Sequence, residues 1–290
     1  MTDLSSTPPS GPVARLPVVQ TVADAYRFTL QRIGQVVIAA VVPFSLSMLI
    51  ALINYNLGEG PFTFVTILVD LFAYAIFAVA WHRALLVNEA PNLIPRLGNR
   101  QLRFWLMGLL IALVMTGVAF VPTLLFGFLA AGAGQGAVAL FVLPVLLLCA
   151  YLLARFSFVF PAAAVDERFG LGASWRTTAD NAWRLIGAYL LAILPMMVAV
   201  LGLMVVASGL LGVAVPIGGP VEAIEPAMGG AVAVFVIVAF SVVNYIFAAV
   251  FVSLLSLSFR TCTGWVADSG QTPPGGSAPR DDGSGDARYH

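Results

Sequence analysis

The sequence predicts an all-α, polytopic membrane protein with six transmembrane helices, and three observations lead to this fold class. Hydrophobic residues make up 60% of the chain and charged residues only 10%, against about 45–50% and about 25% in soluble domains. Six apolar runs are long enough to cross a hydrocarbon core of about 30 Å, which takes about 20 helical residues. Basic residues gather in alternate connections between these runs, as they do in multi-pass membrane proteins.

Each apolar run is expected to form one transmembrane helix. The runs cover residues 33–54, 62–83, 104–130, 137–159, 186–215 and 231–259. Four of them contain a proline, namely Pro43, Pro122, Pro144 and Pro195. Proline removes a backbone donor, but in a membrane bundle neighbouring helices can satisfy the freed carbonyl groups. We therefore expect kinks at these prolines rather than helix ends.

The distribution of arginine predicts the orientation. All fourteen basic residues are arginine. They precede the first run, lie between the second and third and between the fourth and fifth, and follow the sixth. Cytoplasmic loops hold the excess of basic residues, so we expect both termini in the cytoplasm. The tryptophans fall on the same side, at headgroup level; they are Trp81, Trp105, Trp175, Trp183 and Trp265.

The two ends of the chain are expected to be disordered and cytoplasmic. Residues 1–20 are polar and proline-rich and lack the features of a signal peptide, so the first apolar run is expected to direct insertion. Residues 268–290 are rich in Gly, Pro, Ser and Asp and offer almost nothing to bury. The transmembrane domain is accordingly expected over residues 21–267.

A helix is expected to lead into the first apolar run. Thr21 has the side chain of an N-cap, and Asp24 follows three residues later. Apolar residues of this segment recur on one helical face, and polar residues lie on the other. The apolar face holds Val22, Tyr26, Leu30 and Ile33, and the polar face holds Asp24, Arg27 and Gln31.

Three units of about 70–80 residues repeat the same order of features. Each unit has an amphipathic lead-in with arginine, a span, a connection without arginine, and a second span that ends in arginine. The lead-ins read AYRFTLQRIG, NRQLRFWLMG and SWRTTADNAWRLIG. We interpret the units as three helix hairpins with interfacial lead-in helices. The alternative is that membrane topology alone places arginine at every inner end.

The chain resembles a known family. It is similar to the polytopic membrane domain attached to some bacterial glycerophosphodiester phosphodiesterases, and to related uncharacterised six-span inner-membrane proteins. The resemblance covers residues 22–266 and rests on the run LLARFSFVFPAAAVDERFGLGASWRTTADNAWRLIG, with AWHRALLVNEAPN upstream. It implies a six-helix inner-membrane domain. It does not carry over the phosphodiesterase activity, because that chemistry belongs to a separate soluble barrel of about 250 residues.

No catalytic, cofactor or metal site is expected. The two histidines, His82 and His290, lie at a helix end and in the tail, so neither a Ser-His-Asp triad nor a metal site can form around them. Cys149 and Cys262 lie too far apart in the expected threading for a disulfide. The glycine-rich run 132–136 follows no strand, so we interpret it as a hairpin turn rather than a phosphate loop.

Three polar residues inside the expected spans are candidate functional residues, namely Asp70, Arg155 and Asn244. Asp70 is expected to face the bundle interior, either as an interhelical hydrogen-bonding clamp or as a proton- or cation-binding group in a transport path. Arg155 is expected to anchor the fourth span. It would extend its stem to the headgroups or pair with an acid such as Glu89 or Asp166.

Residues 174–187 are expected to form one amphipathic helix in the plane of the membrane interface. Trp175, Ala179, Ala182 and Ile186 share one face of this helix, and Arg176, Asp180 and Arg184 lie along another. The candidate interfacial residues are Trp175, Arg176, Trp183 and Arg184. The segment either docks a partner or an anionic headgroup, or serves only as an elbow between two spans.

These observations favour a non-enzymatic membrane domain that organises or regulates a membrane process through a protein or lipid partner. The net charge of zero gives no basis for binding nucleic acid, and the arginines are expected to meet anionic headgroups at the cytoplasmic face. The alternative is a permease or channel for a small solute. A lipid-acting membrane enzyme is disfavoured because polar residues are not clustered.

Overall fold

The computed structural model describes residues 15–57, 63–133, 135–211 and 230–267, and these residues are helical with short connections and no strand. The all-α fold class is confirmed. The helices are α1 (Val18–Gln31), α2 (Ile33–Leu57), α3 (Thr63–Leu86), α4 (Asn99–Ala133), α5 (Gln135–Phe156), α6 (Val159–Ala164), α7 (Leu171–Thr177), α8 (Ala182–Leu211) and α9 (Gly230–Thr263). The tail 268–290 and most of the N-terminal segment 1–20 lie outside the described residues.

Six of these helices are long and apolar enough to cross a membrane, namely α2, α3, α4, α5, α8 and α9. Each corresponds to one predicted run, and the ends differ by a few residues. The prolines that interrupt four of the runs all lie inside helices, so the expectation that they do not end the spans is confirmed. Composition and length therefore account for an integral, multi-pass membrane protein.

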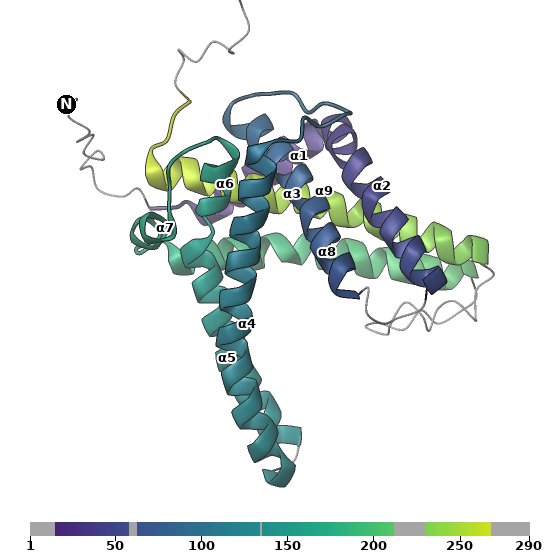
Figure 1. Ribbon diagram of the computed structural model, residues 1–290, viewed down its shortest axis with the longest axis vertical. Helices are drawn as coiled ribbons and strands as arrows, with labels where there is room; N and C mark the ends of the chain where they lie inside the picture. Colours follow the sequence, from purple (N-terminus) through teal and green to yellow (C-terminus); the bar gives the residue numbers. More distant parts are fainter. Residues whose placement is uncertain (1–14, 58–62, 134, 212–229, 268–290) are drawn as a thin grey trace, which may run out of the picture.

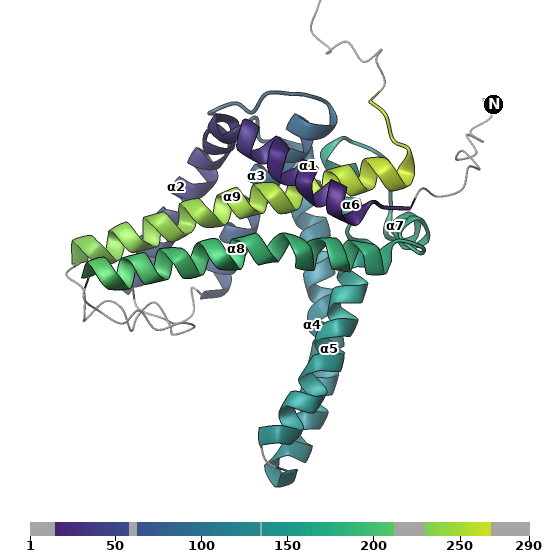
Figure 2. The ribbon, with the colours of Figure 1, turned by 180° about the vertical axis from the view of Figure 1, so that it is seen from behind.

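The six long helices pair into three hairpins, α2–α3, α4–α5 and α8–α9, whose members pack against each other. The hairpins meet at one end and diverge toward the other, so that α4 and α5 run together away from α8 and α9 in both Figure 1 and Figure 2. α1 lies along α8 and α9 near the end where the hairpins meet. We call this end the arginine-rich end, because Arg83, Arg100, Arg155 and Arg260 lie there.

The tightly packed core lies at the arginine-rich end. One buried cluster joins Val36, Trp81, Phe104 and Ala249 of four helices, and a second joins Phe158, Leu185 and Phe259. Away from the arginine-rich end, the long helices expose large apolar side chains instead, as helices that face lipid do.

Polar side chains cross-link the helices inside this core. The indole Nε1 of Trp81 donates to Ala249 O at 2.9 Å and to Ser253 Oγ at 2.8 Å. The hydroxyls of Thr29 and Ser253 lie 3.2 Å apart, and His82 Nδ1 lies 2.6 Å from Ser256 Oγ. These bonds tie α1 and α3 to α9, and they satisfy polar groups that no water reaches.

The first lead-in differs from its prediction at both ends. α1 begins at Val18 after Pro17, one turn before the expected start, and Thr21 Oγ1 donates to Pro17 O at 2.8 Å instead of capping the helix. Proline suits this position because its missing N–H would have no partner in the first turn. Val22 is buried as predicted, but Leu30 is 59% exposed, because the buried face turns toward Ala25 and Thr29.

The third lead-in is not one helix, so that prediction is wrong. α7 ends at Thr177, a turn covers residues 178–181, and α8 begins at Ala182. Thr178 Oγ1 donates to Ser174 O at 2.7 Å and to Arg155 O at 3.1 Å. Asn181 Oδ1 accepts from Leu16 N at 2.9 Å. Short polar side chains that bind backbone groups compete with helical bonds, which explains the break.

Candidate functional site

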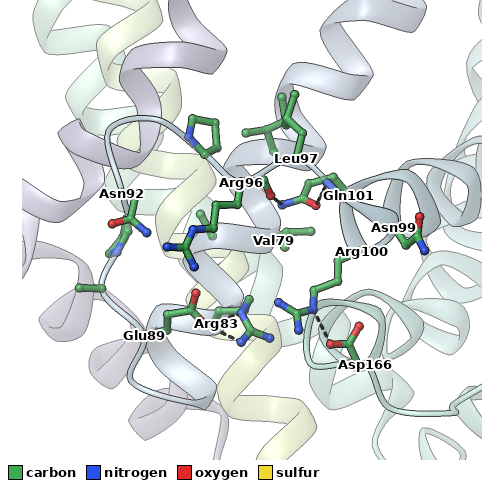
Figure 3. Close-up of a pocket in the computed structure, with 16 residues that line it drawn as sticks. Val79, Arg83, Glu89, Asn92, Arg96, Leu97, Asn99, Arg100, Gln101 and Asp166 are labelled. Atoms are coloured by element: carbon green, nitrogen blue, oxygen red, sulfur yellow. Dashed lines mark hydrogen bonds and ion pairs between the residues drawn. The ribbon is translucent and has the colours of Figure 1, made fainter. Parts of the chain in front are cut away.

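A pocket of about 500 Å³ opens at the arginine-rich end (Figure 3). Its walls come from the end of α3, the connection 87–98, the start of α4 and Asp166, the second residue after α6. Five charged side chains line it, namely Arg83, Glu89, Arg96, Arg100 and Asp166. Its deeper wall is apolar and is formed by Ile76, Val79 and Ala80 of α3. The pocket is therefore polar at its mouth and apolar below.

Local sequence signals shape the mouth of this pocket. α3 ends at Leu86, and Asn88 follows with a φ of 53°, a left-handed conformation that asparagine tolerates better than most residues. Pro91 and Pro95 keep the connection from continuing as a helix. At the start of α4, the Gln101 side chain accepts from Gly98 N and donates to Arg96 O, each at 3.1 Å. This bracing resembles a capping box and fixes the backbone of Arg96.

Two ion pairs hold the walls of the pocket together. Arg83 pairs with Glu89, and its Nη1 also donates to Ala164 O at 3.1 Å. Arg100 pairs with Asp166, which follows α6. Both carboxylates are about half exposed, so each pair contributes at most about 1 kcal/mol. Their main effect is positional, since they join α3, α4 and α6 around one space.

Arg96 differs from the other two arginines of the pocket. Its side chain is exposed and extends into the pocket from the connection (Figure 3). In the described part of the chain, no ion pair engages it. Three guanidinium groups face two carboxylates, which leaves one net positive charge, and Arg96 carries it. A planar guanidinium with free in-plane donors is suited to bind a phosphate or carboxylate group with two parallel hydrogen bonds.

The pocket lacks groups for metal binding or nucleophilic catalysis. Across the described residues, no three His, Cys, Asp or Glu side chains come close enough to hold a metal ion. The lining contains neither serine, cysteine nor histidine. The arrangement can bind an anion beside an apolar group, and this is the chemistry that its side chains support.

Arg155 is buried, and only 5% of the residue is exposed. It pairs with neither Glu89 nor Asp166, because Arg83 and Arg100 hold these two acids. The predicted pairing with one of these two acids is thus wrong, and the predicted contact with the headgroups stays a prediction. Its guanidinium carbon lies 4.1 Å from the ring centroid of Trp175 instead.

The other two intramembrane candidates do not gather around Arg155. Asp70 lies in α3 with an exposed side chain, within electrostatic range of Tyr245 of α9, and the expectation that it faces the bundle interior stays a prediction. Asn244 is exposed on α9 and lines a small pocket of about 220 Å³ against α8, together with Ser241. The structure therefore gives these polar residues separate surroundings.

The four interfacial candidates lie where α7 and α8 meet the end of α5. Trp175 and Trp183 are 37% and 65% exposed, and their ring centroids lie 6.3 Å and 5.7 Å from that of Tyr151. Arg176 is exposed, and Arg184 Nη1 donates to Leu16 O at 3.2 Å. All four residues are therefore exposed along one border of the helices, and Arg184 also ties α8 to the N-terminal segment.

Sequence reasoning missed the arginine-lined pocket. In the sequence, Arg96 and Arg100 served only as indicators of membrane topology. A usable signal was present. Two prolines and a glycine between Glu89 and Asn99 indicate a non-helical connection, and this connection contains an arginine close to an acidic residue.

Comparisons with protein-family models, with curated proteins and with solved structures found no match. The resemblance to the phosphodiesterase-associated membrane domain therefore stays a prediction. Assignment of a function rests on the geometry of the pocket.

Proposed function

We propose that this chain is a non-enzymatic membrane domain that organises a membrane process by holding the headgroup of an anionic phospholipid in the arginine-lined pocket. The observation that carries the proposal is the unpaired Arg96 guanidinium above an apolar wall. The proposal includes a bacterial inner membrane and cytoplasmic termini, so that the pocket meets the leaflet surface whose anionic lipids attract arginine.

The shape of the pocket favours a lipid over a soluble anion. Ile76 lies seven residues before Arg83 on α3, which corresponds to about 10 Å along a helix. A phosphate bound at the mouth would therefore have its glycerol and upper acyl carbons beside Ile76, Val79 and Ala80. A soluble anion would contact only the charged side chains of the mouth.

Phosphatidylglycerol binding to the purified chain in detergent, measured by native mass spectrometry, tests the proposal. Arg96→Ala should weaken binding by about fivefold or more, because an arginine near an anionic surface contributes about 1 kcal/mol even without direct contact. Arg168→Ala removes the same charge from an exposed residue outside the pocket and serves as the matched control. Equal losses in the two variants would contradict a pocket-specific site.

The small pocket between α8 and α9 supports a second candidate function, passage of a small solute. It places the polar side chains of Ser241 and Asn244 between apolar residues of two spans. Asn244→Leu should then abolish solute uptake into proteoliposomes without lowering the folded yield. A proteoliposome that takes up no solute above the lipid background would remove this candidate.

A further inference from the structure

Arg155 is a buried charge without a matching anion. It lies in the last turn of α5, and the residue is only 5% exposed. Its Nε is enclosed and has no hydrogen-bond partner, and in the part of the chain that the structure describes no carboxylate pairs with it. Burial of an arginine normally requires a partner that offsets lost hydration. This side chain therefore needs an acceptor that the described protein groups do not provide.

Two aromatic rings lie close to the guanidinium of Arg155. The guanidinium carbon lies 4.1 Å from the ring centroid of Trp175 and 5.7 Å from that of Tyr151. Such stacking stabilises the cation through the ring faces. The N–H donors of arginine lie in the guanidinium plane, and stacked rings cannot accept from them. The unmet requirement is thus an anion with two oxygens that approaches in that plane.

The backbone around Arg155 is held in place from a neighbouring helix. Arg155 O accepts from Ser174 Oγ at 2.7 Å and from Thr178 Oγ1 at 3.1 Å. Ser174 and Thr178 are buried; Ser174 lies in α7, and Thr178 is the residue that directly follows this helix. These bonds fix Trp175, which lies between them in sequence, over the guanidinium. The stack is therefore a rigid structure rather than a contact between two free side chains.

We propose that the stack of Arg155, Tyr151 and Trp175 binds the phosphate group of a membrane phospholipid, as a site separate from the arginine-lined pocket. The partly exposed Trp175 and Trp183 rings place the stack at headgroup level, because amphipathic rings concentrate there. A lipid phosphate supplies in-plane oxygens to the guanidinium, and its acyl chains continue along the apolar surface of α5. The phosphate reaches Arg155 beside the Trp175 ring, through the remaining exposed part of the side chain.

The test uses the Arg96→Ala chain, so that the arginine-lined pocket no longer contributes. Arg155→Lys in this background keeps the positive charge and the cation–π contact but loses the planar fork. It should weaken phosphatidylglycerol binding by about ten- to a hundredfold, the effect expected for a hydrogen bond to a charged group. Arg176→Lys, on the exposed neighbour, is the matched control and should change binding less than about twofold. Equal affinities of the two variants would overturn the proposal.

Two further measurements do not depend on the folding of the Arg155 variant. Diacylglycerol, which has the same acyl chains without phosphate, should not be retained by the Arg96→Ala chain, and millimolar inorganic phosphate should not displace phosphatidylglycerol. Retention of diacylglycerol or displacement by inorganic phosphate would each overturn the lipid-phosphate assignment. Trp175→Phe preserves the stack, and it should reduce fluorescence quenching by phosphatidylglycerol brominated near its ester groups. Unchanged quenching would place the lipid elsewhere.

The outcome is independent of the proposed function. If Arg96→Ala alone leaves lipid binding unchanged, the pocket assignment fails while the Arg155 stack is still tested in the same protein. If Arg96→Ala weakens lipid binding and Arg155→Lys has no effect, the Arg155 assignment fails while the pocket assignment stands.

Discussion

Removal of the hydroxyl of Ser253 should destabilise the folded protein, whereas removal of the hydroxyl of Ser258 should not. Both serines are fully buried on α9. Ser253 Oγ accepts from Trp81 Nε1 at 2.8 Å and lies 3.2 Å from Thr29 Oγ1. Among the described residues, Ser258 Oγ has no hydrogen-bond partner. The two alanine substitutions delete the same atom from the same helix, and they differ only in whether that atom joins other helices.

The expected magnitude follows from the geometry of the shared donor. In Ser253→Ala, Trp81 Nε1 keeps its second acceptor, Ala249 O, at 2.9 Å, so the indole is not left without a bond. The loss is then one interhelical hydrogen bond, about 0.5–1.5 kcal/mol in proteins generally and about 0.6 kcal/mol on average in membrane bundles. The Thr29 hydroxyl also loses a partner. We expect a total loss of about 1 kcal/mol for Ser253→Ala and about zero or a slight gain for Ser258→Ala.

Equilibrium unfolding in mixed micelles measures these differences, and a double-mutant cycle isolates the bond. Trp81→Phe removes the donor and keeps most of the ring volume. The cycle of Trp81→Phe with Ser253→Ala should give a coupling energy of about 0.5–1 kcal/mol, and the cycle with Ser258→Ala should give none. The reasoning is refuted if the two serine variants lose equal stability, or if both cycles give the same coupling.

Three further predictions concern topology, Asp70 and pH. Cysteine at position 135 should react with an impermeant thiol reagent from outside the cell, and cysteines at Asn99 and Gly172 should not; labelling of Gly172→Cys from outside would reverse the topology. Asp70→Asn should fold with unchanged or slightly higher stability, because the exposed carboxylate lies within a span and its charge is costly there. A midpoint temperature of unfolding as low as that of Asp70→Leu would instead indicate an ionised, paired group. Burial raises the pKa of Tyr26 above its usual 10.0, and the Tyr26 hydroxyl donates to Ala192 O at 2.6 Å. The stability that this bond contributes is therefore fully present below about pH 10 and is lost as pH rises through the raised pKa. Tyr26→Phe should reduce the fall in unfolding free energy at high pH, and an unchanged pH profile would rule out this origin.

Apolar length and composition were sufficient to predict the spans. A run of about 20 apolar residues has few alternatives to a membrane helix, because every backbone group in lipid must be satisfied within the segment. The divergence of the hairpins had no such signal. A helix face that meets lipid and one that meets another helix are both apolar, so the sequence of α4 or α8 does not specify which neighbour covers it.

The break in residues 178–181 shows where periodicity misleads. Arg176, Asp180 and Arg184 recur every four residues, and this spacing alone favours a continuous helix. The chain leaves the helix because Thr178 and Asn181 find backbone partners in Arg155 and Leu16. Both partners are distant in sequence, and only the folded arrangement brings them within reach. A local pattern could not have indicated them.

The choice of ion pairs depends on how α3 and α6 end. Glu89 follows Asn88, and Asp166 follows α6; Asn88 and Asp166 adopt positive φ values of 53° and 62°. A left-handed residue after a helix reverses the chain direction, and asparagine and aspartate are among the few side chains that tolerate it. These turns bring both carboxylates to Arg83 and Arg100 across the pocket. Once these acids are engaged, neither is available to Arg155. The same two turns thus build the arginine-lined pocket and, within the part of the chain that the structure describes, leave Arg155 without a paired carboxylate.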